Sequence, residues 1–208
     1  MIRYIYADDL ARYPALRISM LRDRATQFHD RLKWDVTVDA DGYEQDQYDR
    51  LNPLYVIWEE GGVHGGSMRF LPTTGDTMVN DHFAHLAGGE ITAPSIWETT
   101  RFCVSPGSAN KARVANLLMM AGGQLGVGFG LSHSIGVFDA RMVRIYRQLG
   151  WEPEILGTDG IGRDAISAGL WAFDEAILTR MCLAAGVSRE LSQLWFDRTF
   201  GATILKAA

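Results

Sequence analysis

Residues 54–70 have the sequence LYVIWEEGGVHGGSMRF, which indicates how the central part of the chain folds. Residues 54–58 are rich in aromatic and β-branched side chains, residues 59–62 supply charge and glycine for a turn, and residues 63–70 return as a second β-rich run. The stretch therefore predicts a β-hairpin.

Further elements are predicted on either side of this hairpin. Upstream, Asp8 and Asp9 precede apolar residues at helical spacing, which predicts a helix that starts near residue 8. Downstream, strands and helices alternate, and this order is typical of a mixed sheet with helices on its faces, of the α/β or α+β class. The predicted elements are strands at 96–104, 132–138 and 165–173, and helices at 108–122, 139–149, 174–186 and from residue 188 onward.

Composition fits one globular domain that spans residues 1–208. Hydrophobic residues make up 47% of the chain and charged residues 22%, which excludes a disordered protein. The 20 Lys and Arg residues are outnumbered by 25 Asp and Glu residues. The resulting net charge of −5 argues against a protein that binds nucleic acid.

Cysteine content and apolar segments bear on location. The two cysteines, Cys103 and Cys182, exclude a disulfide scaffold and fit a reducing compartment. Residues 1–13 lack the apolar segment of a secretory signal. The most apolar run, residues 114–131, is interrupted by polar residues and five glycines, so no membrane span is expected. We therefore expect a cytoplasmic protein.

Charged residues inside predicted strands are the first candidates for chemistry. Glu98 and Arg101 lie within the β-rich sequence WETTRF at 97–102, and Arg69 lies in the second strand of the hairpin. Because successive strand residues point to opposite faces, Glu98 and Arg101 can serve one site only if a β-bulge intervenes. The alternatives are a structural ion pair for Glu98 and Arg101, and a rim charge for Arg69.

Residues 22–49 show no clear periodicity but contain several aromatic residues, which favours a functional segment over a disordered one. Glu44, Asp46 and Asp49 follow arginines such as Arg24. These carboxylates either form a solvated acidic loop or bind a cationic amine, with the arginines holding them through bidentate pairs.

Other motifs predict little chemistry. His82 and His85 have no third ligand nearby, so no metal site is expected. The glycine-rich run at 122–126 lacks both the Lys-Ser/Thr ending and the preceding strand of a phosphate loop. Neither cysteine has a basic neighbour in sequence, which argues against a thiolate nucleophile.

Five separated motifs occur in a distinctive order. They are Arg24-x-x-x-Phe28, Trp34, Glu44-x-Asp46-x-x-Asp49, Gly66-x-x-Arg69 and Trp97-Glu98-x-x-Arg101-Phe102. In this order and spacing they resemble the acyl-homoserine-lactone synthases, the LuxI-type autoinducer synthases. The resemblance runs from the first helix through Trp151. It implies a fold related to the GCN5-related N-acetyltransferases, a mixed twisted sheet flanked by helices and split by a V-shaped cleft.

The resemblance also implies a reaction. The family joins the α-amine of S-adenosylmethionine to an acyl group from acyl carrier protein, or in some members from acyl-coenzyme A. It then closes the lactone and releases methylthioadenosine. The expected partners are therefore S-adenosylmethionine and one of these two acyl donors, with no cofactor and no metal, in a monomer or weak dimer.

Residue roles follow from the resemblance. Glu98 is the implied catalytic base, because a carboxylate in an apolar strand tends toward a raised pKa and accepts a proton near neutral pH. Arg101 is the second implied catalytic residue, and with Arg69 it orients the substrate carboxylate or holds the aspartates. Residues 22–49 form the implied mobile segment that covers the substrate. The implied S-adenosylmethionine pocket comprises Arg24, Phe28, Trp34, Asp46, Asp49, Arg69 and Phe102.

The acyl chain is expected beneath the cleft, among side chains whose alternative role, as part of a generic core, the sequence pattern favours. Gly136 lies three residues before Asp139, where synthases of 3-oxo-acyl products often carry Thr. Because glycine offers no hydroxyl, we predict a product without the 3-oxo group, and a pocket with room for a bulky, branched, aryl or long chain. The acyl-pocket candidates are Met78, Leu118, Met119, Leu125, Gly136, Val137, Met142 and Tyr146.

Basic residues bear on the acyl donor. Arg141, Arg144 and Arg147 share the polar face of one predicted helix, which is either a solvated face or, with Lys111 and Arg113, a docking surface for acidic acyl carrier protein. Coenzyme A would instead use Lys111 and Arg113 near a helix start to hold its phosphates. The sequence does not separate these two donors.

Two other functions stay open. An acyl-CoA N-acyltransferase acting on another amine would share the fold, but the chain has the Arg24, Phe28 and Trp34 cluster and lacks the Gln/Arg-x-x-Gly-x-Gly/Ala loop. A non-catalytic ligand-binding relative is disfavoured by the presence of Glu98 and Arg101. Release of methylthioadenosine distinguishes the synthase from both.

Overall fold

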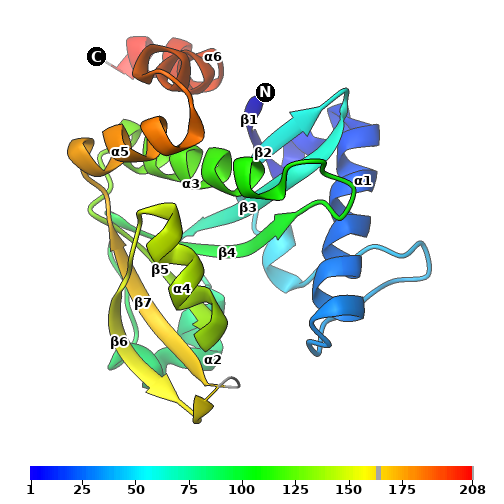
Figure 1. The fold of residues 1–208 in the computed structure, drawn as a ribbon, viewed down its shortest axis with the longest axis vertical. Helices are drawn as coiled ribbons and strands as arrows, with labels where there is room; N and C mark the ends of the chain where they lie inside the picture. The colour runs from blue at the N-terminus through cyan, green and yellow to red at the C-terminus, as the bar shows by residue number, and fades with distance from the viewer. Residues whose placement is uncertain (163–164, 208) are drawn as a thin grey trace.

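The hairpin forms the second and third strands of a seven-stranded mixed sheet, shown in Figure 1. The structure is a computed structural model that describes residues 1–162 and 165–207. The strand order is β1-β2-β3-β4-β5-β7-β6, antiparallel throughout except for the parallel pair β4–β5. This confirms the mixed sheet expected from the sequence. The strands are β1 Ile2–Tyr6, β2 Leu54–Glu60, β3 Val63–Pro72, β4 Ile96–Val104, β5 His133–Asp139, β6 Glu154–Asp159 and β7 Ile166–Ala172.

Helices cover both faces of the sheet (Figure 1). Side chains alternate along β2, so Val56 packs in the larger core beside α3, whereas Tyr55 and Ile57 pack in a smaller core beneath α1. Within the described ranges, no helix is both long and apolar enough to cross a membrane. The helical elements are η1 Ala7–Arg12, α1 Pro14–Arg24, η2 Ala25–Arg31, η3 Gln47–Arg50, α2 Met78–Ala87, α3 Lys111–Gly128, α4 Ala140–Leu149, α5 Glu175–Ala185 and α6 Arg189–Ala207.

The first helix begins later than the sequence pattern predicted. A short 3₁₀ helix, η1, follows β1, and the α-helix starts at Pro14 rather than near Asp8. Proline lacks the backbone N–H that a helix interior needs but fits the first helical position, so it fixes the start of α1. Strands β1 and β6 and helix α2 were not predicted.

Strand β4 contains a β-bulge that decides where its charged residues point. Ser67 of β3 pairs with Cys103, but Arg69 pairs with Thr100, so β4 has one extra residue between these pairs. Arg101 lies in this stretch with a φ of 55°. The extra residue brings Arg101 onto the face of Glu98 and Thr100, which is the condition that the sequence set for one shared site.

The cleft arises where β4 and β5 separate. These strands pair only over three residues on each side, ending at Glu98 and Ile135, and both continue beyond that point. A cavity of about 1010 Å³ lies between the diverging strands, lined by residues 99–102 of β4 and 136–139 of β5. The V-shaped cleft expected from the resemblance is therefore present.

The glycine-rich run lies inside helix α3 and allows close packing. A Cβ atom at Gly126 would lie 2.1 Å from the ring of Phe173, and one at Gly128 would lie 2.4 Å from the ring of Phe196. These glycines let α3 approach both Phe173, which precedes α5, and Phe196 of α6. The glycine-rich run therefore serves close helix packing rather than phosphate binding.

We predict that Gly126→Ala lowers the free energy of unfolding by about 1–3 kcal/mol, because overpacking against Phe173 outweighs the gain in helix propensity. Gly122→Ala is the matched control, since its Cβ would lie 3.3 Å from Phe70 and 3.4 Å from Met68 and needs only a small adjustment. Urea unfolding of both variants measures the difference. Equal stability of the two variants would contradict the packing argument.

Candidate active site

The cavity between β4 and β5 collects side chains from several distant parts of the chain. Its walls come from the segment after α1, from α2, from both diverging strands and from α4. Its lining is largely apolar and includes a few charged side chains, among them Arg101 and Lys111. The sequence candidates that line it are Phe28, Trp34, Met78, Arg101, Phe102, Lys111, Met119, Gly136, Val137, Arg141, Met142 and Tyr146.

An aromatic pair covers the cavity beside Arg101. Phe28, in the π-helical turn η2, stacks on Trp34 with ring centroids 5.2 Å apart and planes 10° apart. The guanidinium carbon of Arg101 lies 5.5 Å from the Phe28 ring centroid, which is the geometry of a cation–π contact. Arg101, the residue at the β-bulge, therefore contacts the 22–49 segment through Phe28.

A buried ion network lies behind this wall. Arg24, at the end of α1, binds Glu44 through Nε at 2.6 Å and binds both oxygens of Asp49 at 3.0 and 2.9 Å. Tyr55 also donates a short hydrogen bond to Asp49. Burial alone would raise the pKa of Asp49, but Arg24 and Arg69 hold it well below its usual range.

Two strand arginines complete the network. The two terminal nitrogens of Arg69, on β3, donate to the two carboxylate oxygens of Asp46 at 2.6 and 2.9 Å, and its Nε donates to the Thr100 hydroxyl at 3.0 Å. Arg101 reaches Asp46 at 2.8 Å and Glu44 at 2.9 Å. Three guanidinium groups thus face three carboxylates, and the bidentate pairs inferred from the sequence are present.

Charge balance limits what this network can bind. All three carboxylates already have arginine partners, so a substrate amine would have to share one of them. Asp46 is the most accessible of the three, with 14% of its side chain exposed. The three carboxylates therefore belong to a buried salt-bridge cluster rather than to the solvated acidic loop that the sequence left as an alternative.

Glu98 lies beneath the cavity and does not line it. It is 1% exposed, and its carboxylate accepts the backbone N–H of Val79 at 2.6 Å and of Met78 at 3.2 Å, so it caps helix α2. Burial raises the pKa of Glu98 to about 7, although these two donors and Arg69 act in the opposite direction.

One end of the cavity has an aromatic wall, of which only Tyr146 was predicted from the sequence. The rings of Phe138, Tyr146 and Trp171 meet edge to face, with centroids 5.0 to 5.4 Å apart. A Cβ atom at Gly136 would lie 2.9 Å from the Thr99 carbonyl oxygen and 3.2 Å from Trp171. Glycine therefore fits at position 136 of β5, between Thr99 and the aromatic wall, where a larger side chain would force its neighbours to move.

Several predicted residues lie outside the cavity. Leu118 and Leu125 were expected at the acyl chain, but they are seven residues apart on the core face of α3, where Leu118 packs toward Gly66. Met119 is turned about 100° from Leu118 around the helix and does reach the cavity. Arg24, Asp46, Asp49, Arg69 and Glu98 lie behind the cavity wall.

The predicted docking residues are on the surface. Arg113, Arg144 and Arg147 are exposed and do not line the cavity, whereas Lys111 and Arg141 stand at its edge. Arg141 pairs with Asp139 at 2.6 Å, and Arg147 pairs with Glu152 at 3.2 Å.

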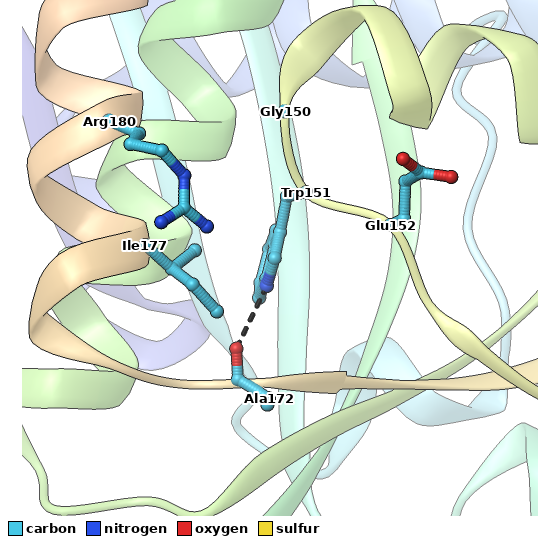
Figure 2. A pocket seen from close by; sticks show the side chains of 6 residues that line it. All are labelled: Gly150, Trp151, Glu152, Ala172, Ile177 and Arg180. Atoms are coloured by element: carbon cyan, nitrogen blue, oxygen red, sulfur yellow. Dashed lines mark hydrogen bonds between the residues drawn. The ribbon is translucent and has the colours of Figure 1, made fainter.

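A second cavity, of about 420 Å³, lies between the end of α4 and helix α5 (Figure 2). Figure 2 shows the Trp151 ring between Ile177 and Glu152, with its indole N–H donating to the carbonyl oxygen of Ala172 at 2.9 Å. Trp151 also lines the larger cavity, so this one side chain contributes to both.

We predict that Arg24→Ala lowers the free energy of unfolding by about 3–5 kcal/mol, because it leaves two buried carboxylates short of a partner. The control is Arg12→Ala, which breaks an exposed pair with Asp9 and should cost less than about 1 kcal/mol. Urea unfolding measures both. A small effect of Arg24→Ala would show that the network is dispensable for the fold.

Comparison with known proteins finds a family match over most of the chain. The model of the autoinducer synthase family matches residues 11–181. An acyl-homoserine-lactone synthase from Rhizobium etli is 36% identical over 200 residues, which cover 93% of each protein.

Solved structures share the fold. The coenzyme-A-dependent acyl-homoserine lactone synthase BjaI, solved with S-adenosylmethionine and isopentyl-CoA, aligns with a TM-score of 0.81 at 24% identity, covering 90% of both chains. An acyl-CoA N-acyltransferase from Pseudomonas aeruginosa aligns with a TM-score of 0.54 at 14% identity, over 83% of this chain and 99% of that one. Since the family model and the Rhizobium etli relative each span most of the sequence, this chain belongs to the autoinducer synthase family, the acyltransferases that make acyl-homoserine lactones.

Proposed function

We propose that the cavity binds S-adenosylmethionine and an acyl thioester, joins them through an amide bond, and releases an acyl-homoserine lactone and methylthioadenosine. The observation that carries the proposal is the cavity itself, which places an apolar, aromatic-walled end next to an aromatic cover and a buried carboxylate with a pKa of about 7. BjaI, which shares the fold, was solved with both kinds of substrate.

Glu98 is the proposed base for the first step. The ammonium group of S-adenosylmethionine must lose a proton before its nitrogen can attack the thioester carbonyl. The new C–N bond forms as the C–S bond breaks, and the thiol of the carrier leaves. Because Glu98 does not line the cavity, we propose that a water molecule in the cavity relays the proton to it. Met78, whose backbone N–H binds the Glu98 carboxylate, lines the cavity at this point.

Lactone closure needs orientation more than acid–base help. The carboxylate of the substrate attacks the carbon next to the sulfonium, the C–S bond breaks, and methylthioadenosine leaves with the electron pair. This attack is intramolecular, so a pocket that keeps the substrate folded supplies much of the acceleration. We assign that task to Phe28, Trp34 and Phe102, with Arg101 directing the carboxylate and Arg24, Asp46, Asp49 and Arg69 shaping the wall. Residues 22–49 are proposed to close over the substrate.

The Glu98 role predicts a pH dependence. Only the ionised carboxylate can accept a proton, so kcat/KM should rise with pH up to about 7 and then level off. Glu98→Gln should lower kcat by at least about 100-fold and remove this limb, so that any remaining pH dependence belongs to the substrate amine. An unchanged pH profile in Glu98→Gln would leave Glu98 as a helix cap only.

The residues around Gly136 bear on whether the acyl chain of the product carries a 3-oxo group. Thr99 and Ser134 also line this part of the cavity, but Ser134 donates its proton to the Trp97 carbonyl at 3.1 Å and Thr99 donates to Ser134. Neither hydroxyl keeps a free O–H for a 3-oxo group, and Gly136 has none. We therefore propose an acyl chain without the 3-oxo group.

The central test is incubation with S-adenosylmethionine and a panel of acyl chains, each unsubstituted or 3-oxo, on both carriers. Mass spectrometry should find methylthioadenosine together with an acyl-homoserine lactone that lacks the 3-oxo group. Donor consumption without methylthioadenosine would indicate a plain acyltransferase. The hydroxyl of Tyr146 makes no hydrogen bond within the described residues, so it is the alternative donor to a 3-oxo group, and Tyr146→Phe tests it. If a 3-oxo product forms and Tyr146→Phe abolishes it, Tyr146 supplies the donor and the Gly136 argument is wrong.

Substitution of an exposed arginine distinguishes acyl carrier protein from coenzyme A as the carrier of the acyl group. Lys111 at the start of α3 lines the cavity, and we propose that it meets a phosphate of either donor. Arg144 is exposed and does not line the cavity, and we propose that it contacts a protein carrier alone. If acyl carrier protein is the donor, Arg144→Glu should lower kcat/KM for that donor by about tenfold and leave acyl-coenzyme A unaffected. Arg198→Glu, an exposed change on α6, is the control. An equal loss with both donors would contradict a docking role.

A further inference from the structure

A second polar cluster lies beneath helix α1. His64, near the start of β3, contacts Asp23 of α1 through Nδ1 at 2.7 Å and Ser67 through Nε2 at 2.9 Å. Its backbone N–H donates to the Ser19 hydroxyl, also on α1, at 2.9 Å. His64 and Ser67 are 3% and 2% exposed. None of these four residues has a role of its own in the proposed reaction, although Asp23 lies within the 22–49 segment and Ser67 lies between Gly66 and Arg69.

The partners define the protonation state of the ring. Asp23 can only accept, so Nδ1 carries the proton and donates to its carboxylate. Burial lowers the pKa of His64, so the ring is neutral at pH 7 and Nε2 accepts the Ser67 hydroxyl proton. Both ring nitrogens are thereby used, one for each element that the ring joins.

The contacts have the order of a Ser-His-Asp triad, yet the surroundings exclude nucleophilic chemistry. Ser67 is enclosed between the sheet and α1 and lines neither cavity, so no carbonyl group can approach its oxygen. The remaining use of such a cluster is mechanical, because it fixes the last turn of α1 against β3.

That turn is where the active site begins. Asp23 directly precedes Arg24, which binds Glu44 and Asp49, and the chain then enters the π-helical turn that carries Phe28. A π-helical turn is uncommon and depends on surrounding contacts to persist. A tether one residue before Arg24 therefore acts on both the ion network and the cover of the cavity.

We propose that His64 is a positioning residue, which ties Asp23 to β3 and so sets the position of Arg24 and of residues 25–38, the part of the 22–49 segment that follows Arg24 and lines the cavity. The proposal rests on the proposed function in one respect, because residues 25–38 are taken to meet S-adenosylmethionine.

Two substitutions separate the halves of the tether. Asn places its amide near the Nδ1 position of His, and Gln places it near the Nε2 position. His64→Asn therefore keeps a donor for Asp23 and loses Ser67, whereas His64→Gln keeps Ser67 and loses Asp23. His85→Gln, an exposed change on α2, is the control and should behave as the parent protein.

We expect His64→Gln and Asp23→Ala to raise KM for S-adenosylmethionine by about tenfold, with kcat and KM for the acyl donor nearly unchanged. His64→Asn and Ser67→Ala should stay within about threefold of the parent. Amide hydrogen exchange at residues 25–38 should quicken in the first pair alone, under conditions where every variant is folded.

Three outcomes would overturn the proposal. A difference between His64→Gln and His64→Asn in unfolding midpoint alone, with equal KM and equal exchange, would make the cluster purely structural. Loss of activity in His64→Asn equal to that in His64→Gln would contradict the Asp23 assignment. Covalent labelling of Ser67 by a fluorophosphonate would show an activated nucleophile. Exchange is measured without turnover, so failure of the proposed function alone would not affect this test.

Discussion

The active-site region depends on the ion network between three arginines and three carboxylates. Glu44, Asp46 and Asp49 lie on a segment with almost no regular structure, and no backbone ladder fixes it to the sheet. What holds it is the set of contacts with Arg24 on α1 and with Arg69 and Arg101 on the central strands. Each buried charge is costly alone and is tolerated because its partners are complete, so the segment docks as a unit or not at all.

The network reaches its partners because β4 is irregular. A regular strand would send Arg101 to the face opposite Thr100, away from Asp46 and Glu44. The bulge and the left-handed conformation of Arg101 correct this, and a non-glycine residue with a φ of 55° needs surrounding contacts to remain there. Two carboxylates and the Phe28 ring supply such contacts. The strained backbone and the ion network therefore support each other.

The sequence predicted the parts of this molecule whose signals are local. The 54–70 hairpin, the amphipathic helix at α4 and the charged motifs could be found because each depends on neighbouring residues. Three features could not. The bulge at Arg101 depends on the register with β3, the aromatic wall joins β5, α4 and β7, and Leu118 and Met119 separate only through the rotation of α3 against the sheet. Glu44, fully buried between two arginines, belongs with the site, and its motif with Asp46 and Asp49 was the available signal.

Glu98 shows how one residue meets two opposing demands. As the cap of α2 it accepts two backbone N–H groups, which favour the charged form and would lower its pKa. As a proposed base it needs a pKa near neutrality, and burial supplies the larger, opposite effect. The sign of this balance has a consequence for stability. Because the pKa is raised on folding, Glu98 favours the folded state below about pH 4.5, and this contribution is lost as pH rises through about 7. The ionised carboxylate that catalysis requires is thus the form that the fold tolerates less well, so stability is given up at the position where the chemistry needs a base.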